Sequence, residues 1–393
     1  MKGSGRHSNS LKILGFEMGK KPSILHVASF IGNVGDNASH AGFYTILDEL
    51  LGSYQVKQVE IRTFYLNYKG SDKKTFDKHF IAYANSFDLV IFGGGGFLDY
   101  WIPGSPTGTS IGIEPGLVKK LKTLTLITSM GSLPKKEIPE GNIDKYRSFL
   151  DNVFNSDNIK IAVRNDGSRQ AIRNDIGNTY ADRISEVVDS GFFYTTKEFH
   201  DKLIKHNYIA INVATDQVEL LEKANVNFSD EHFYKELGRL INAIIHRLGK
   251  HVVLVPHLYG DLTAINRILV GLNDYDLRNY VTVGPCVQGD RGADFIFSLY
   301  KNSDGVIANR LHGNVCSLSM GKNVIGLPVL GRVKSIHESV DSKQFVSVYD
   351  QFSEAIIEKL KIAEMDSAVK NAIAKRKIET IDFYRTQLRD FYE

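Results

Sequence analysis

Short apolar runs alternate with amphipathic stretches along most of the chain. The apolar runs are rich in β-branched residues and bounded by Gly, Asn or Asp, which is typical of parallel strands buried on both faces. In the first half, this pattern predicts strands at 23–30, 56–64, 87–92, 124–129 and 159–163. The amphipathic stretches between them predict helices at 38–51, 73–85, 146–154 and 168–175.

The same alternation starts again in the second half. It predicts a long helix at 230–248 and strands at 208–213, 251–256, 281–283, 305–308 and 323–327. Two such series indicate an α/β protein with two doubly wound, Rossmann-like domains and a cleft between them.

We therefore divide the chain into four parts. The polar residues 1–21 form a flexible tail, and residues 22–190 and 191–350 form the two domains. Residues 351–393 follow a helical pattern and are expected to pack back across the domains as a long C-terminal helix. Because ligands of open parallel sheets bind beyond the carboxyl ends of the strands, the segments after each strand are the first places to look for chemistry.

Composition narrows the class of protein without fixing its activity. The 393 residues are 42% hydrophobic and 24% charged, with a net charge of +3, which is ordinary for a globular protein and predicts no nucleic-acid partner. The chain lacks a long apolar run, an apolar signal-peptide core and a CxxC pair, and its two cysteines are far apart. We expect a cytoplasmic protein without a metal site.

The loop after the first strand reads Gly32-Asn33-Val34-Gly35-Asp36-Asn37. Asp36 or Asn37 is expected to cap the following helix. The free backbone amides of this loop favour an anion or a sugar oxygen as ligand. A plain turn that caps the helix explains the same residues. The loop lacks the GxGxxG spacing of dinucleotide-binding proteins.

Four glycines, 93–96, follow the third strand and precede Tyr100 and Trp101. Consecutive glycines lose much entropy on folding, so we interpret them as a place where a group approaches the backbone closely. Tyr100 and Trp101 then supply aromatic faces for a sugar ring. The alternative is a mobile loop that ends in two core aromatic residues.

Two further strand ends carry a candidate residue each. Arg164 lies before a predicted helix, where it either clamps an anion or pairs with Asp166. His257 ends a strand of the second half and is either a ligand contact or a structural histidine.

The segment Arg310-Leu311-His312-Gly313 is the most informative one. It ends a predicted strand and precedes a helix predicted at 314–320. The guanidinium of Arg310 suits a carboxylate or phosphate, and His312 lies where helix amides favour an anion. Gly313 leaves room for the ligand, and Gly331-Arg332-Val333-Lys334 is expected to add positive charge.

Taken in order, these elements resemble the polysaccharide pyruvyl transferase family. The matching pieces are the 33–36 loop, the 93–97 loop, Arg164 with Ser168, and the 310–313 segment, with Lys334 where the family tends to place a lysine. Asn165 and Asp189-Ser190 depart from the family pattern, which leads us to expect an acidic residue and Asp-Pro at those places.

The resemblance implies a GT-B-like fold and a transferase. Its donor is expected to be phosphoenolpyruvate, and its acceptor a saccharide or lipid-linked oligosaccharide that receives a cyclic pyruvate ketal in polysaccharide or exopolysaccharide biosynthesis. No cofactor beyond this donor is implied. Association with a membrane surface and assembly into a homo-oligomer stay open.

The resemblance and the residues together suggest roles. Arg310, Lys334 and Arg164 are expected to hold the anionic donor, and His312 is an acid or a phosphate contact. Asp36 is the candidate base, so the predicted catalytic residues are His312, Asp36 and Arg310. The remaining predicted substrate contacts are Leu311, Gly313, Asn33, Gly94, Gly95, Tyr100, Trp101 and His257.

Two alternatives compete with this interpretation. One is a GT-B glycosyltransferase with a nucleotide-sugar donor, in which an acidic residue on the helix after residue 310 would often hold the ribose. Residues 311–322 contain no Asp or Glu, which argues against it. The other is a saccharide-binding protein without catalysis, which does not explain why Arg310, His312 and Lys334 are present together.

Overall fold

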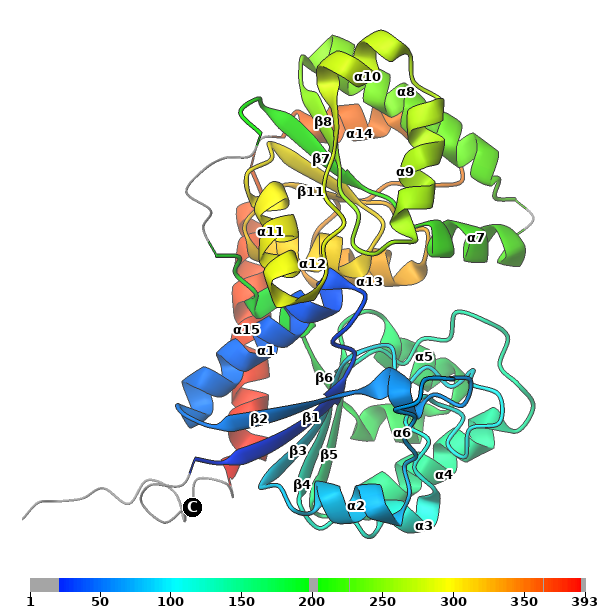
Figure 1. Ribbon diagram of the computed structural model, residues 1–393, viewed down its shortest axis with the longest axis vertical. Coiled ribbons are helices and arrows are strands. Elements are labelled where there is room, and N and C mark those ends of the chain that lie inside the picture. The colour runs from blue at the N-terminus through cyan, green and yellow to red at the C-terminus, as the bar shows by residue number, and fades with distance from the viewer. Residues whose placement is uncertain (1–20, 198–203, 226, 363, 390–393) are drawn as a thin grey trace, which may run out of the picture.

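The computed structural model describes residues 21–197, 204–225, 227–362 and 364–389, and Figure 1 shows two α/β halves, one above the other. The predicted tail, except for Lys21, lies outside the described residues. Each half has a sheet of parallel strands with helices on both faces. Both predicted doubly wound units are therefore confirmed.

The first sheet has the strand order β2-β1-β3-β4-β5-β6. Continuous burial of β3 and β4 fits their place in the middle, whereas half of the β2 residues are exposed at the sheet edge. The elements of this half are β1 (Ser23–Ala28), α1 (Val34–Leu51), β2 (Gln55–Glu60), η1 (Ile61–Phe64), α2 (Lys78–Ala84), β3 (Leu89–Gly95), α3 (Pro115–Val118), β4 (Leu124–Met130), α4 (Asn142–Phe154), β5 (Ile159–Arg164), α5 (Ser168–Asp175), α6 (Asn178–Arg183), β6 (Ser185–Val187) and η2 (Ser190–Phe193).

The second sheet has the strand order β11-β10-β7-β8-β9. The predicted helix 230–248 is present over the same residues, because Ser229 caps its start and Gly249 ends it in a left-handed conformation. The elements of this half are β7 (Tyr208–Asn212), α7 (Thr215–Ala224), α8 (Asp230–Leu248), β8 (His251–Leu254), α9 (Asp261–Val270), α10 (Asp274–Tyr280), β9 (Val281–Val283), α11 (Gly289–Lys301), β10 (Gly305–Ala308), α12 (Leu311–Ser319), β11 (Val324–Gly326) and α13 (Gly331–Ser339).

Several boundaries differ from the predicted ones. The predicted strand 56–64 ends at Glu60, whose carboxylate accepts the Arg62 amide and turns the chain into a short 3-10 helix. The predicted helix 73–85 begins only at Lys78, because Asp77 caps it. Strand β6 was missed because its three residues, Ser185–Val187, include two polar ones and form no apolar run.

The C-terminal segment forms α14 (Ser353–Leu360) and α15 (Ser367–Gln387). Helix α14 packs on α8 of the second half, whereas α15 returns to the first half, where the hydroxyls of Tyr384 and Thr128 lie 2.7 Å apart. The hydroxyl of Thr380 accepts a hydrogen bond from the Val188 amide. Figure 1 shows α15, in red, running beside the first sheet. Within the described ranges, no helix is long and apolar enough to cross a bilayer.

Helix α1 joins the two halves. It begins at the carboxyl end of β1 and packs against η2, α11 and α12 (Figure 1). A Cβ atom at Gly42 would lie only 2.1 Å from the Ser190 carbonyl oxygen, so only glycine permits this close approach. At the N-terminus of α1, the Val34 amide donates to the His257 carbonyl at 3.3 Å. The loops that follow β1 and β8 are therefore in direct contact.

Candidate active site

A cavity of about 950 Å³ lies between the two halves. In each sheet, the chain reverses its direction of strand addition at one point: between β1 and β3 in the first sheet, and between β7 and β10 in the second. Ligands of doubly wound sheets bind outside the carboxyl ends of the strands at these switch points. The loops after β1, β3 and β10 all line the cavity, as does α7 after β7. The cavity therefore joins the ligand-binding edges of both sheets.

On the wall formed by the second half, Arg310 ends the loop after β10 and His312 lies in the first turn of α12. Both are buried, with 6% and 5% of their surface exposed, and both line the cavity together with Leu311. Helix α12 begins three residues earlier than predicted, so His312 lies inside the helix rather than before it. Gly313 does not line the cavity; it packs against Ala308 instead.

The guanidinium of Arg310 is held by two carboxylates. Its Nη2 atom lies 2.5 Å from Asp261 and 2.7 Å from Asp216, and its Nε atom also donates to Asp261. Burial alone would lower the pKa of Arg310, but these two aspartates raise it above its ordinary value. The guanidinium is therefore a fixed cation at the cavity wall.

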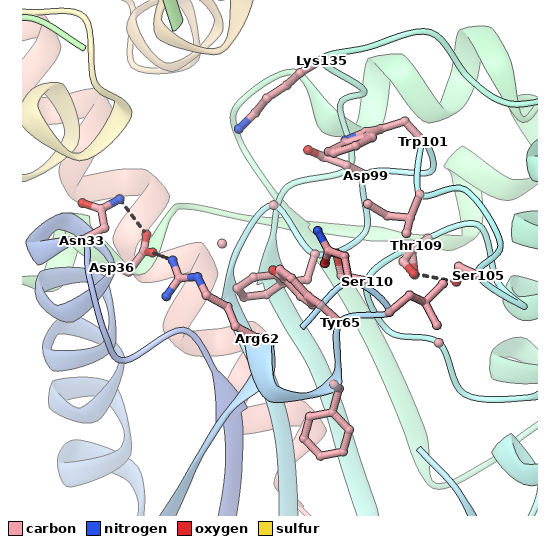
Figure 2. Close-up of a pocket in the computed structure, with 18 of the residues that line it drawn as sticks. Asn33, Asp36, Arg62, Tyr65, Asp99, Trp101, Ser105, Thr109, Ser110 and Lys135 are labelled. Atoms are coloured by element: carbon pink, nitrogen blue, oxygen red, sulfur yellow. Dashed lines mark hydrogen bonds and ion pairs between the residues drawn. The ribbon is translucent and has the colours of Figure 1, made fainter. Parts of the chain in front are cut away.

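On the facing wall, Asn33 and Asp36 belong to the start of α1 (Figure 2). The helix is capped by Asn33, whose side-chain oxygen accepts the Gly35 amide at 3.0 Å, and not by Asp36 or Asn37 as predicted. The helix starts earlier than the apolar pattern indicates, which places Asp36 in its first turn. Asp36 is consequently free to face the cavity, and Arg62 approaches it to 3.9 Å.

The ring of His312 lies between two carboxylates from the first half. Its Nδ1 atom is 3.6 Å from Asp36, and its Nε2 atom is 3.4 Å from Asp189. Gly35 makes this approach possible, since a Cβ atom there would lie 2.7 Å from His312 Nδ1. The predicted acid and the predicted base are therefore brought together across the boundary between the halves.

Asp189 is fully buried after β6. Burial by itself would raise the pKa of this carboxyl, but His312, Arg164 and the Gly191 amide hold it well below its usual range. Asp189 therefore carries a negative charge at neutral pH and orients the imidazole of His312. Its own amide donates to Asn165, which explains why an amide side chain serves at that position.

Arg164 connects Asp189 with a second buried carboxylate. It pairs with Asp166 at 2.7 Å and with Asp189 at 3.1 Å, and burial, which lowers its pKa, is outweighed by these two groups. The pairing with Asp166 is confirmed, and because Arg164 also lines the cavity, its role as an anion clamp stays a prediction.

Arg332 extends this network across the cleft. From α13 it pairs with Asp99 of the first half at 2.5 Å, and its Nε atom is 3.5 Å from Asp166. Lys334, by contrast, is exposed, pairs with Glu338 on its own helix and does not line the cavity. The helical turn from 332 to 334 directs Lys334 to the outer face. The cation that α13 contributes to the cavity is Arg332, which corrects the expectation for Lys334.

The glycine run is filled by protein side chains rather than left open for a ligand. A Cβ atom at Gly94 would meet the ring of His40 at 2.7 Å, and one at Gly95 would meet the ring of Phe97 at 2.6 Å. At Gly96 it would meet Arg332 at 2.9 Å. Gly95 still borders the cavity, whereas Gly94 does not.

The two aromatic residues after the glycines have different positions. Tyr100 is fully buried, stacks on Tyr146 and bonds to Asp175, so the prediction that it contacts a sugar is wrong. Trp101 does line the cavity, and Lys136 lies 4.7 Å from its ring centre. Figure 2 shows Trp101 beside Asp99 and Lys135 on one side of the opening.

His257 is structural as well as part of the cavity lining. Its Nε2 atom is 2.7 Å from the Tyr300 hydroxyl, and its amide donates to Asp261. Burial, followed by repulsion from Arg310 and His312, lowers its pKa well below the ordinary value. The ring is therefore neutral at neutral pH and does not supply charge for an anion.

The polysaccharide pyruvyl transferase family model matches residues 33–330, which is more than half of the chain. The matched region begins at Asn33 and includes the charged residues of the network described above, apart from those on α13, such as Arg332, because this helix begins just after it. The chain belongs to the polysaccharide pyruvyl transferase family. It is accordingly a transferase, and the family assigns it to polysaccharide biosynthesis. A search of curated proteins finds no match.

Solved structures confirm the GT-B type of fold for this pyruvyl transferase family member. The UDP-GlcNAc 2-epimerase of Methanocaldococcus jannaschii is similar with a TM-score of 0.52 at 12% identity, covering 92% of this chain and 99% of that one. A putative UDP-N-acetylglucosamine 2-epimerase from Listeria monocytogenes gives a TM-score of 0.54 at 9% identity, with coverage of 94% and 97%. At these identities, the likeness concerns the fold alone.

Sequence reasoning missed four aspartates, one lysine and one arginine, Arg62, of this site. Asp99, Asp189, Asp216 and Asp261 each follow a strand of one of the two sheets, and Lys135 follows β4. Their position after strands was the available signal. It was weak because many surface loops also contain aspartate and lysine.

Proposed function

We propose that this enzyme transfers the pyruvyl group of phosphoenolpyruvate to two hydroxyls of a saccharide acceptor, forming a cyclic ketal and releasing phosphate. One observation carries the proposal: Arg310 and His312, at the N-terminus of α12, face Asp36 across the cavity between the halves. A helix N-terminus with a fixed guanidinium suits an anionic donor, and a histidine next to a carboxylate suits proton transfer.

The reaction requires two carbon–oxygen bonds to form at the central carbon of the donor. One acceptor hydroxyl adds to that carbon while the methylene carbon gains a proton and becomes a methyl group. The second hydroxyl then displaces phosphate, which breaks the bond between the central carbon and the bridging oxygen. Of the two hydroxyl protons released, one balances the proton gained by carbon and the other leaves with phosphate.

The charged residues of the cavity fit these steps. Asp36 borders the cavity and is our candidate for accepting the proton of the attacking hydroxyl. His312, held between Asp36 and Asp189, is our candidate for delivering a proton to the donor. Arg310 binds the donor as a cation whose geometry is already fixed by Asp261, so little reorganisation is needed when the anion binds.

The acceptor is expected to lie against the first half. Trp101 offers an aromatic face there, and Asn33 and Arg62 offer polar groups near Asp36 (Figure 2). Mixed aromatic and hydrogen-bonding surfaces suit sugars, whose rings have apolar faces and polar edges. Galactoside- and mannosamine-type acceptors, free or lipid-linked, are the ones to test.

The test is to incubate the purified full chain with phosphoenolpyruvate and each acceptor. We expect phosphate release that depends on the acceptor, and an acceptor product heavier by one pyruvate less one water. Thermal-shift measurements with phosphoenolpyruvate and with UDP- and CMP-sugars separate the alternatives. Stabilisation by a nucleotide sugar alone, without phosphate release from phosphoenolpyruvate, would favour a glycosyltransferase and contradict the proposal.

A further inference from the structure

The arginines that line the cavity are all paired with carboxylates. Arg310 is shared by Asp216 and Asp261, Arg164 by Asp166 and Asp189, and Arg332 by Asp99 and Asp166; Arg62 lies against Asp36 and Glu60. These ion pairs fix the guanidiniums in place, but they also neutralise them. An anion with several charges needs further positive charge from the cavity.

Lys135 is the exception. It lines the same cavity, yet it forms no ion pair or hydrogen bond with any residue in the described part of the chain. Figure 2 shows its side chain extending from the loop into the open space of the cavity, away from Asp99 and Trp101. The amino group is therefore available to a ligand.

The loop that carries Lys135 is held firmly at the cavity. It follows β4, and the Leu133 amide donates to Asp99 at 2.9 Å while the Leu133 carbonyl accepts from Arg332 at 2.7 Å. The Ser132 amide donates to Ser168 at 2.7 Å. Asp99 and Leu133, which both bind Arg332, thus anchor the start of the loop two residues before Lys135.

This position places the ammonium group of Lys135 close to the guanidinium groups of Arg332 and Arg164. Repulsion from Arg332 is the main cause that lowers the pKa of Lys135 to about 8; the enclosing cavity walls and Arg164 lower it further, and Asp99 and Asp216 oppose the shift. Asp99 is already bound to Arg332, and among the residues that the structure describes no carboxylate forms an ion pair with the ammonium. A bound anion would relieve the repulsion and favour the charged form of the lysine.

We propose that Lys135 is a donor-binding residue whose ammonium group contacts the phosphate of phosphoenolpyruvate. The inference rests on the proposed function for the identity of the donor. Phosphate is the better partner because lysine provides a compact point charge, whereas the planar Arg310 fork matches a carboxylate. The phosphate gains charge as its bond to carbon breaks, so a cation at this place also stabilises the leaving group.

The first experiment compares Lys135→Ala with two other lysine variants. Lys122→Ala is the matched control, because Lys122 is exposed before the opposite, amino end of β4 and does not line the cavity. We expect Lys135→Ala to raise the KM for phosphoenolpyruvate at least tenfold, and Lys122→Ala to leave it unchanged. Lys334→Ala tests the lysine that the family resemblance suggested. If Lys334→Ala raises the KM and Lys135→Ala does not, the proposal is overturned.

The second experiment measures kcat/KM as a function of pH, because a lysine with a purely structural role would not shape this pH profile. The kcat/KM for phosphoenolpyruvate should fall as the pH rises through about 8, because the free enzyme loses the ammonium charge. Lys135→Arg keeps its charge up to much higher pH and should not show this fall. An identical alkaline limb in the wild type and in Lys135→Arg would assign the titration to another group and contradict the proposal.

Direct binding separates this inference from the proposed function. Calorimetry with phosphoenolpyruvate and with inorganic phosphate requires no acceptor and no turnover. Weaker binding of both by Lys135→Ala than by the wild type supports the phosphate contact even if no acceptor is ever pyruvylated. Equal binding by the two proteins, or no binding by the wild type, refutes it.

Discussion

Replacing Gly96 by alanine tests whether the glycine run serves the ion pair between the two halves. Gly96 does not adopt a left-handed backbone conformation, so alanine introduces no backbone strain. The added Cβ atom would, however, lie 2.9 Å from Arg332 Nη1 and 3.0 Å from Asp99 Oδ2. Both contacts fall on the pair that links α13 to the loop after β3.

The size of the effect follows from these distances. An ordinary contact needs at least 3.4 Å, so the guanidinium and the carboxylate each have to move by several tenths of an ångström. Their ends can move without disturbing the core, and alanine reduces the entropy of the unfolded chain, so the free energy of unfolding should change by less than about 1 kcal/mol. Displacing a binding group such as Arg332 next to the reacting atoms, in contrast, lowers the rate of the reaction roughly 100-fold. That loss corresponds to about 2.7 kcal/mol of transition-state stabilisation.

The assay is the kcat/KM for phosphate release from phosphoenolpyruvate, measured beside urea unfolding of the same preparation. Gly116→Ala is the matched control, because Gly116 is exposed in α3 and an added Cβ atom meets nothing within 4 Å. We expect Gly96→Ala to lose activity while both variants unfold like the wild type. Full activity of Gly96→Ala would show that the position of Arg332 is unimportant and would refute the reasoning.

Three further substitutions test the rest of the network. His312→Ala should lower kcat by about 10²–10⁴ with little loss of stability, as expected for a proton-transfer group; activity close to that of the wild type would exclude this role. Arg310→Ala should destabilise the protein by about 3–5 kcal/mol in urea unfolding, because it leaves Asp261 buried without its partner, and an unchanged midpoint would contradict that assignment. Asp189→Asn should be less stable than the wild type at pH 7. Because folding lowers the pKa of Asp189, its stabilisation exists above the ordinary carboxyl pKa near 4 and is lost on acidification. The difference in stability should therefore shrink below about pH 4, and a difference independent of pH would argue against a charged Asp189.

The strands, and helices such as α1, α5 and α8, could be predicted because their signal is local, whereas α7, α9 and α11 were not predicted. Burial on both faces requires continuous apolar runs, and the ten predicted strands all lie in the two sheets. Boundaries were less accessible, because caps decide them. Asn33 rather than Asp36 caps α1, and Arg310 rather than a later residue precedes α12.

The sequence by itself determined the two parallel sheets, the position of Arg310 and His312 after a strand, and the order of motifs that marks the family. These properties depend on hydrophobic periodicity and on residues close together in the chain. Only the tertiary structure decided that Asp36 and Asp189 enclose His312, that Arg332 and Lys135 line the cavity instead of Lys334, and that Tyr100 belongs to the core. Each of these contacts joins residues far apart in sequence. The packing of α1 against η2, α11 and α12 brings the two halves together around His312, and hydrophobic periodicity carries no information about that packing.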